Sequence, residues 1–93
     1  MTKYRIDYDP EFEDDIKKFK KTGDKLAENK IKTLLKELAE HPKTGTGKPE
    51  QLKGYNGKRW SRRITQRHRL CYEIHDDIIL VLVFAAYGHY EDD

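Results

Sequence analysis

Six side chains in the second half of this 93-residue chain have the types that phosphate chemistry needs. A carboxylate can remove a proton from a hydroxyl, a histidine can return a proton near neutral pH, and cations can stabilise negative charge that develops on a phosphate. A tyrosine can stack on a base or hold a phosphate through its hydroxyl. The side chains that supply these groups are Glu50, Lys53, Arg63, Arg69, His89 and Tyr90. As a set, they suit RNA cleavage without a metal ion, in which the ribose 2′-hydroxyl attacks the adjacent phosphate.

Arg63 lies in a strand predicted over residues 58–65. Successive side chains of a strand point to opposite faces of the sheet. Arg63 therefore points away from the face shared by Trp60, Arg62 and Ile64. If the apolar members of that group face the core, Arg63 lies on the open face.

Arg69 begins a second predicted strand, over residues 69–75, in which Leu70 and Tyr72 belong to the apolar face. By the same alternation, Arg69 joins Arg63 on the open face. Two fixed guanidinium groups can hold a phosphate. The alternative is a pair of ordinary surface arginines on a solvated sheet.

The remaining candidates stand at the ends of predicted elements. Glu50 ends a polar loop over residues 43–50 in a segment rich in cations, where a carboxylate should stay ionised and accept a proton. His89 and Tyr90 follow an apolar run over residues 78–86, so the sheet would hold them at its rim. The alternatives are a solvated loop carboxylate and a frayed terminus with an incidental histidine.

The elements that position these groups are predicted from apolar spacing and capping residues. The run at 78–86 is apolar on both parities, which is typical of a central strand covered on one face and at least partly on the other. We expect an α+β fold, in which an antiparallel two-helix hairpin packs on a small, mainly antiparallel sheet. The order β-α-α-β-β-β-β comprises a strand at 4–8, a helix from Pro10 to a break at Thr22-Gly23, a helix capped by Asp24 and closed by His41-Pro42, and strands at 51–53, 58–65, 69–75 and 78–86.

Charge is distributed unevenly along the chain, although the net charge is only +2. Residues 1–42 carry equal numbers of basic and acidic side chains. Residues 43–75 carry nine basic and two acidic side chains, and residues 76–93 carry five acids and no lysine or arginine. A basic middle segment favours a phosphate-bearing partner.

Composition excludes several other classes of protein. A hydrophobic content of 35% and a charged content of 39% indicate one small core under a solvated surface. The chain has neither an apolar run long enough for a membrane span nor a signal peptide, and Cys71 is its only cysteine. No Cys/His cluster has zinc spacing, and no acidic cluster suggests magnesium. We therefore expect a cytoplasmic protein with no disulfide, membrane contact, metal or cofactor.

Four motifs closely resemble the YoeB/Txe toxins, a branch of the RelE/ParE superfamily found in bacterial toxin–antitoxin modules. They are GKPEQLK at 47–53, WSRRIT at 60–65, HRLCY at 68–72 and the HY pair at 89–90. In length and element order, the resemblance covers nearly the whole chain and implies a single RelE/ParE-like toxin domain over residues 1–93. It also implies a ribosome-dependent mRNA endonuclease that cuts in the A site and inhibits translation.

The resemblance implies a role for each candidate residue. Glu50 would be the general base, His89 the general acid and Arg69 the stabiliser of the transition state. Tyr90, the fourth catalytic residue, would help to orient the RNA near the scissile bond, and Lys53 and Arg63 would contact phosphate. The implied partners are a YefM/Axe-like antitoxin, the ribosome and its mRNA, and the resemblance also allows a homodimer.

Two departures from the family pattern concern the end of the chain. The acidic residues 91–93 follow the His-Tyr pair with which family members typically end, and three acids beside a phosphate site would lower RNA affinity or raise the pKa of His89. Gly88 stands where the family often has a bulky aromatic residue. Two other functions stay open: a ParE-like toxin that targets DNA gyrase, and a catalytically silent module that binds RNA or an antitoxin. Neither needs a base, a cation and an acid around one phosphate.

Overall fold

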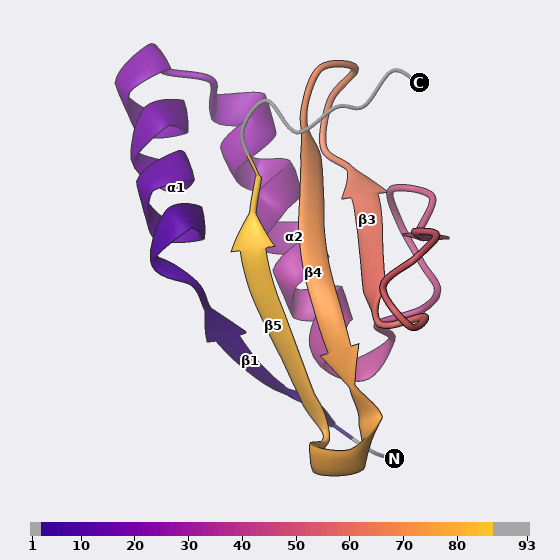
Figure 1. The fold of residues 1–93 in the computed structure, drawn as a ribbon. Helices are drawn as coiled ribbons and strands as arrows, with labels where there is room; N and C mark the ends of the chain where they lie inside the picture. The colour runs from indigo at the N-terminus through magenta and orange to yellow at the C-terminus, as the bar shows by residue number, and fades with distance from the viewer. Residues whose placement is uncertain (1–2, 87–93) are drawn as a thin grey trace.

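The structure, a computed structural model, describes residues 3–86 of the chain, so His89 and Tyr90 lie outside the described residues. Within residues 3–86, two helices and a five-stranded sheet follow the order predicted from the sequence (Figure 1). The elements are β1 (Arg5–Tyr8), α1 (Pro10–Thr22), α2 (Lys25–Glu40), β2 (Glu50–Gln51), β3 (Arg59–Arg63), β4 (Arg69–His75), a 3₁₀ turn (Asp76–Ile78) and β5 (Leu80–Ala85).

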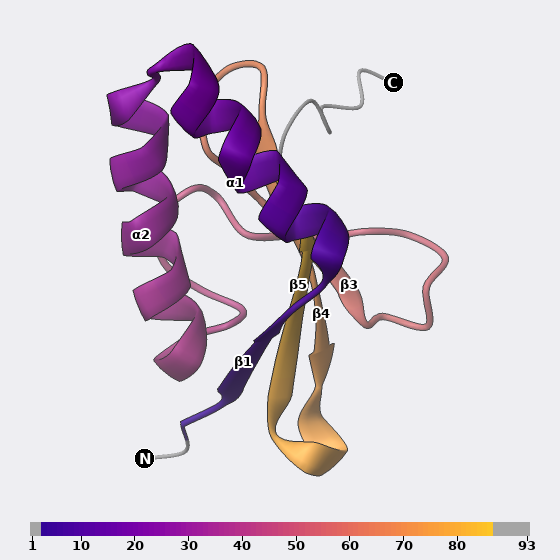
Figure 2. The same cartoon turned by 90° about the vertical axis from the view of Figure 1, so that its left-hand side faces the viewer.

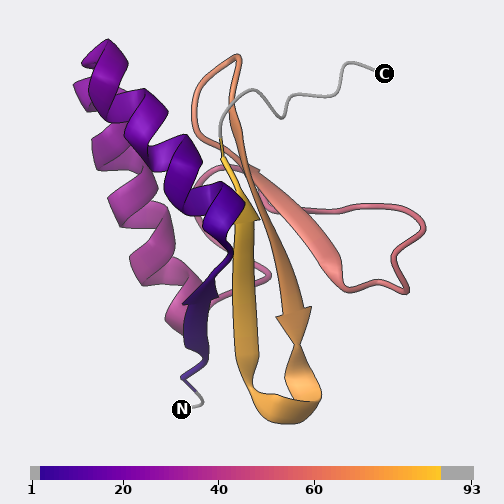
Figure 3. The same ribbon diagram turned by 60° about the vertical axis from the view of Figure 1, so that its left-hand side comes forward.

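The sheet has the strand order β1-β5-β4-β3-β2. β1 pairs with β5 in parallel, and the other three pairings are antiparallel. The two helices lie on the same face of the sheet, which gives two layers (Figures 2 and 3). The α+β fold with a mainly antiparallel sheet is confirmed, and β5 is a central strand as predicted.

The helix boundaries follow from local capping chemistry. The Asp9 side chain accepts a hydrogen bond from the Glu11 amide at 2.9 Å, and Pro10 occupies the first helical position, where its missing N–H costs nothing. Gly23 ends α1 in the left-handed conformation, with φ of 73°, and Asp24 caps α2. These signals lie next to one another in the sequence, so the helical hairpin was predicted correctly.

The core lies between the helical hairpin and the sheet. Leu70 and Tyr72 of β4 and Val81 and Val83 of β5 are fully buried under the helices. Burying side chains of this size stabilises the fold by about 1.5–3 kcal/mol each. The buried helical partners are Phe12, Phe19, Ala27, Ile31, Leu34 and Leu38.

The predicted strand at 78–86 begins later than expected. Ile78 belongs to the 3₁₀ turn, and Ile79 adopts a left-handed conformation with φ of 53°, its amide donating to the Asp76 carbonyl. Both isoleucines are exposed. An apolar run alone does not reveal that its first residues are used to complete a turn.

The strand predicted at 58–65 is also shorter, because Thr65 contributes to a turn. Its hydroxyl accepts hydrogen bonds from the amides of Arg67 and His68, both at 3.2 Å, which is a common device for turning the backbone. The short strand predicted at 51–53 instead comprises Glu50 and Gln51. Within residues 3–86, no helix has the length and apolar character that a bilayer span requires.

Candidate functional site

The two arginines predicted to share the open face do so. Arg63 and Arg69 are direct partners across β3 and β4. Arg63 is exposed, and the Arg69 side chain keeps 19% of its accessible surface. Like charges placed directly opposite each other destabilise a sheet, so this pair needs a negative charge nearby that compensates it.

Glu50 supplies a carboxylate to the same place. It is the first residue of the edge strand β2 and pairs with Ser61 of β3. Arg69 Nη1 lies 3.3 Å from Glu50 Oε1 and 3.4 Å from Ser61 Oγ, so the arginine side chain spans β3. Because 63% of the Glu50 side chain is exposed, a solute that reaches the arginines can also reach this carboxylate.

The three other predicted site residues do not take part in these contacts or lie outside the described residues. Lys53 is exposed in the loop after β2, and the site contacts seen among the described residues join Glu50, Ser61 and Arg69 without it. His89 and Tyr90 are outside the described residues, so their predicted roles stay predictions. No cluster of three or more His, Cys, Asp or Glu side chains within residues 3–86 has a metal-binding arrangement.

A third arginine on the open face, Arg59, has different surroundings. Its Nε lies 2.7 Å from Glu73 Oε2, and its guanidinium carbon lies 4.4 Å from the Phe84 ring centroid and 4.6 Å from that of Tyr55. Burial raises the pKa of Glu73, but hydrogen bonds from Arg59 and His75 outweigh burial and hold that pKa below its usual range. Arg59 thus has a carboxylate and two aromatic rings as partners of its own, separate from the contact between Glu50 and Arg69.

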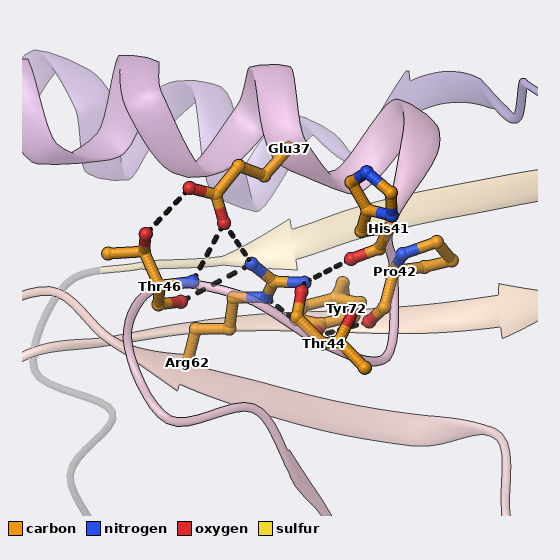
Figure 4. A network of polar contacts seen from close by, with 7 residues as sticks. All are labelled: Glu37, His41, Pro42, Thr44, Thr46, Arg62 and Tyr72. Atoms are coloured by element: carbon orange, nitrogen blue, oxygen red, sulfur yellow. Dashed lines mark hydrogen bonds and ion pairs between the residues drawn. The ribbon is translucent and has the colours of Figure 1, made fainter.

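The opposite face of β3 holds a residue whose role is not evident from the sequence. Arg62 was assigned to the apolar face by parity, and it has no exposed side-chain surface at all. Its Nε donates to the Tyr72 hydroxyl at 3.1 Å, and Nη1 lies 2.9 Å from Glu37 Oε1 (Figure 4). A buried charge needs such partners, so parity could have predicted that partners exist. It could not have predicted which ones.

Glu37 connects this buried arginine to the loop that follows α2. Its Oε1 and Oε2 accept hydrogen bonds from the Thr46 amide at 2.8 Å and the Thr46 hydroxyl at 2.6 Å. The hydroxyl bond is the main reason that the pKa of Glu37 lies below its usual range; the Thr46 amide and Arg62 lower it further, against an opposing effect of burial. The loop leading to Glu50 is therefore fastened by ionic hydrogen bonds.

Comparison with known proteins defines the class of the chain. Residues 8–90 match the family described as YoeB-like toxin of bacterial type II toxin–antitoxin system. Toxin YoeB of Escherichia coli (strain K12) is 45% identical over 67 residues, which cover 72% of this chain and 77% of that protein. The chain therefore belongs to the YoeB-like toxin family. This confirms the resemblance that the four sequence motifs indicated.

Solved structures of the family share the fold. A YoeB/ParE toxin from Agrobacterium tumefaciens is 32% identical with a TM-score of 0.81, over 92% of this chain and 99% of that one. A YoeB dimer from Staphylococcus aureus is 33% identical with a TM-score of 0.78. A heterotetrameric YoeB–YefM toxin–antitoxin complex from the same organism has 33% identity and a TM-score of 0.75. Each Staphylococcus comparison covers 96% of this chain and all of that chain.

Proposed function

We propose that this toxin is a ribosome-dependent mRNA endonuclease that cuts translated mRNA in the A site without a metal ion. One observation carries the proposal: the Glu50 carboxylate lies 3.3 Å from Arg69, and Arg63 stands directly opposite Arg69 on the same open face. A base and two cations around one point are what phosphodiester cleavage by a neighbouring hydroxyl requires. Family membership supports the proposal.

In the proposed reaction, Glu50 removes the proton of the ribose 2′-hydroxyl. The 2′-oxygen attacks phosphorus, and the bond from phosphorus to the 5′-oxygen breaks, which leaves a 2′,3′-cyclic phosphate. Arg69 and Arg63 stabilise the doubly charged phosphorane, and Lys53 contacts the phosphate backbone. His89 protonates the leaving 5′-oxygen, and Tyr90 orients the RNA; these two roles rest on the family resemblance alone.

The proposed partners follow from the same family. We infer a YefM/Axe-like antitoxin whose C-terminal segment, disordered when free, folds over the open face that carries Arg63 and Arg69. The YoeB–YefM complex from Staphylococcus aureus supports this partner, and the YoeB dimer supports a homodimer as a further state. Residues 1–93 would act as one domain in the cytoplasm, where ribosomes are present.

Primer extension on translated mRNA after induction of the chain tests the proposal. We expect cuts at ribosome-bound codons and a rapid block of translation. Arg69→Ala should abolish the cuts, because it removes the cation nearest to Glu50. Arg67→Ala is the matched control, since it removes an exposed arginine from the β3–β4 turn and should leave the cuts in place.

Three results would overturn the proposal. Full cleavage by Arg69→Ala would remove the site from the reaction. Growth arrest with intact translation and damaged DNA would instead support a gyrase-targeting toxin. Binding to RNA or antitoxin with no cleavage by the unaltered chain would support the catalytically silent module.

A further inference from the structure

The loop between α2 and β2 is held from beneath by a side chain of the sheet. Arg62 Nη2 donates to the carbonyls of His41 and Thr44, the latter at 2.7 Å, and Nη1 donates to the Thr46 carbonyl at 3.3 Å. These three acceptors are backbone atoms of a segment that has no strand or helix pairing of its own (Figure 4). Because the Arg62 side chain is fully buried, water does not compete for these bonds, and each is stronger than on the surface.

A carboxylate from the helical layer completes the arrangement. Glu37 balances the charge of Arg62 at 2.9 Å and accepts both hydrogen bonds of Thr46. We call Arg62, Glu37 and Thr46 the loop clamp. It joins α2, the loop and β3 in one network, so the loop cannot shift without breaking ionic hydrogen bonds.

The loop backbone also lies directly against β3. The Arg63 amide donates to the Gly47 carbonyl at 2.7 Å. Gly47 has φ of +86°, and a Cβ placed there would lie 2.9 Å from the Arg63 carbonyl oxygen and 3.2 Å from Arg62 Cβ. Only glycine permits both this backbone conformation and this close approach. The contact lies three residues before Glu50.

The strand that carries Glu50 is too short to position it alone. β2 has two residues, Glu50 and Gln51, that pair with β3, and just after them the Leu52 amide donates to the Arg59 carbonyl at 2.8 Å. A two-residue edge strand has few hydrogen bonds to resist local opening. The clamp and the Gly47 contact supply the missing restraint just upstream of the carboxylate.

We propose that Arg62 is a positioning residue: by clamping the 41–49 loop on the buried face of β3, it holds Glu50 beside Arg69 on the open face. The inference rests on the proposed function, in which Glu50 is the base. Displacing a catalytic group by about 1 Å can slow a reaction by about 10²-fold, so a clamp that never touches RNA can still control the rate. Arg62 and Arg63, which are neighbours in β3, therefore serve the same site from opposite faces of the sheet.

The test measures single-turnover cleavage of mRNA on programmed ribosomes together with amide hydrogen exchange of the free protein. Arg62→Lys keeps the charge but lacks the planar set of donors that reaches several acceptors at once. We expect its cleavage rate at saturating ribosomes to fall about 10²-fold, with little change in the ribosome concentration for half-maximal rate. Exchange of the Arg63 amide should rise about tenfold relative to that of the next amide, Ile64, which donates to the His68 carbonyl within the β3–β4 turn.

Gly47→Ala is the second variant, because it leaves the clamp side chains in place and moves the loop directly. It should show the same loss of rate at saturation and the same loss of Arg63 amide protection. Gly23→Ala is the matched control. Gly23 also has a positive φ, of 73°, but a Cβ there meets nothing within 4 Å, and Gly23 is distant in sequence from the 41–49 loop. Its cleavage rate should stay within about twofold of the unaltered chain.

Glu50→Gln separates failure of this inference from failure of the proposed function. If Glu50→Gln abolishes cleavage while Arg62→Lys and Gly47→Ala cleave at the unaltered rate, the positioning role is overturned and the proposed function stands. Unchanged protection of the Arg63 amide in both loop variants also overturns the positioning role. Undiminished cleavage by Glu50→Gln overturns the proposed base instead.

Discussion

Two glutamate–arginine pairs lie on opposite faces of the same sheet. On the helix-covered face, Glu37 and Arg62 are 2.9 Å apart, with the arginine fully buried and 27% of the glutamate side chain exposed. On the open face, Glu50 and Arg69 are 3.3 Å apart, with 63% of the glutamate and 19% of the arginine side chain exposed. The residue types are the same, but the amount of water around them differs.

That difference decides what each pair can do. In the buried pair, the Arg62 charge has lost its water and depends on its protein partners, so the pair locks the loop to the sheet. In the open pair, water still solvates the carboxylate, so the pair contributes little to stability and its groups remain accessible to a ligand. One face of β3 is therefore structural, and the other is available for chemistry.

The largest contrast is expected from the same substitution at neighbouring positions. Arg62→Met leaves Glu37 and several loop carbonyls without their donor, which should lower the free energy of unfolding by about 3–5 kcal/mol. Arg63→Met, on the open face, should change it by less than about 0.5 kcal/mol. Urea unfolding followed by circular dichroism measures both. Equal losses in the two variants would contradict the division between the faces.

A smaller contrast is expected between the two glutamates. At pH 7, Glu37→Gln should lower the free energy of unfolding by about 1.5–3 kcal/mol, because it weakens hydrogen bonds to a buried charge. Glu50→Gln should lower it by less than about 1 kcal/mol, because that pair is solvated.

The effect of Glu37→Gln should also depend on pH. The pKa of Glu37 is lowered in the folded protein, so its carboxylate stabilises the fold fully above its unfolded pKa of about 4.3. This stabilisation is lost as the pH falls through the lowered folded value. Urea titrations from pH 7 to pH 3 should therefore show the difference between the unaltered chain and Glu37→Gln shrinking below about pH 4. If the difference grew in acid instead, the pKa of Glu37 would not be lowered by folding.

The smallest contrast concerns two exposed threonines whose hydroxyl groups each donate one hydrogen bond. Thr46→Val removes the bond to Glu37 Oε2 and should cost about 1 kcal/mol, since the acceptor is charged. Thr33→Val removes a bond to the Asn29 carbonyl within α2 and should change stability by less than about 0.5 kcal/mol. Thermal unfolding of the two variants provides the comparison, and a larger loss in Thr33→Val would argue against the loop clamp.

Much of the fold was predictable because its signals are local. The caps at Asp9 and Asp24 and the break at Gly23 act on residues within one helical turn, so the sequence alone placed the helical hairpin. Strand ends were harder to predict. Whether Ile79 begins a strand or completes a turn depends on how the 3₁₀ turn joins β4 to β5, and apolar character is compatible with either.

The candidate site likewise combines features that the sequence predicts with features that only the tertiary structure decides. Alternation along β3 and β4 determined that Arg63 and Arg69 share a face and that Arg62 points inward, because the alternation is a property of the extended backbone itself. Only the tertiary structure decided that Arg62 meets Glu37, 25 residues away, and that Glu50 reaches Arg69 across an intervening strand. Such contacts depend on how the helices lie over the sheet and how a loop returns to its edge, and these arrangements are set by packing between segments distant in sequence.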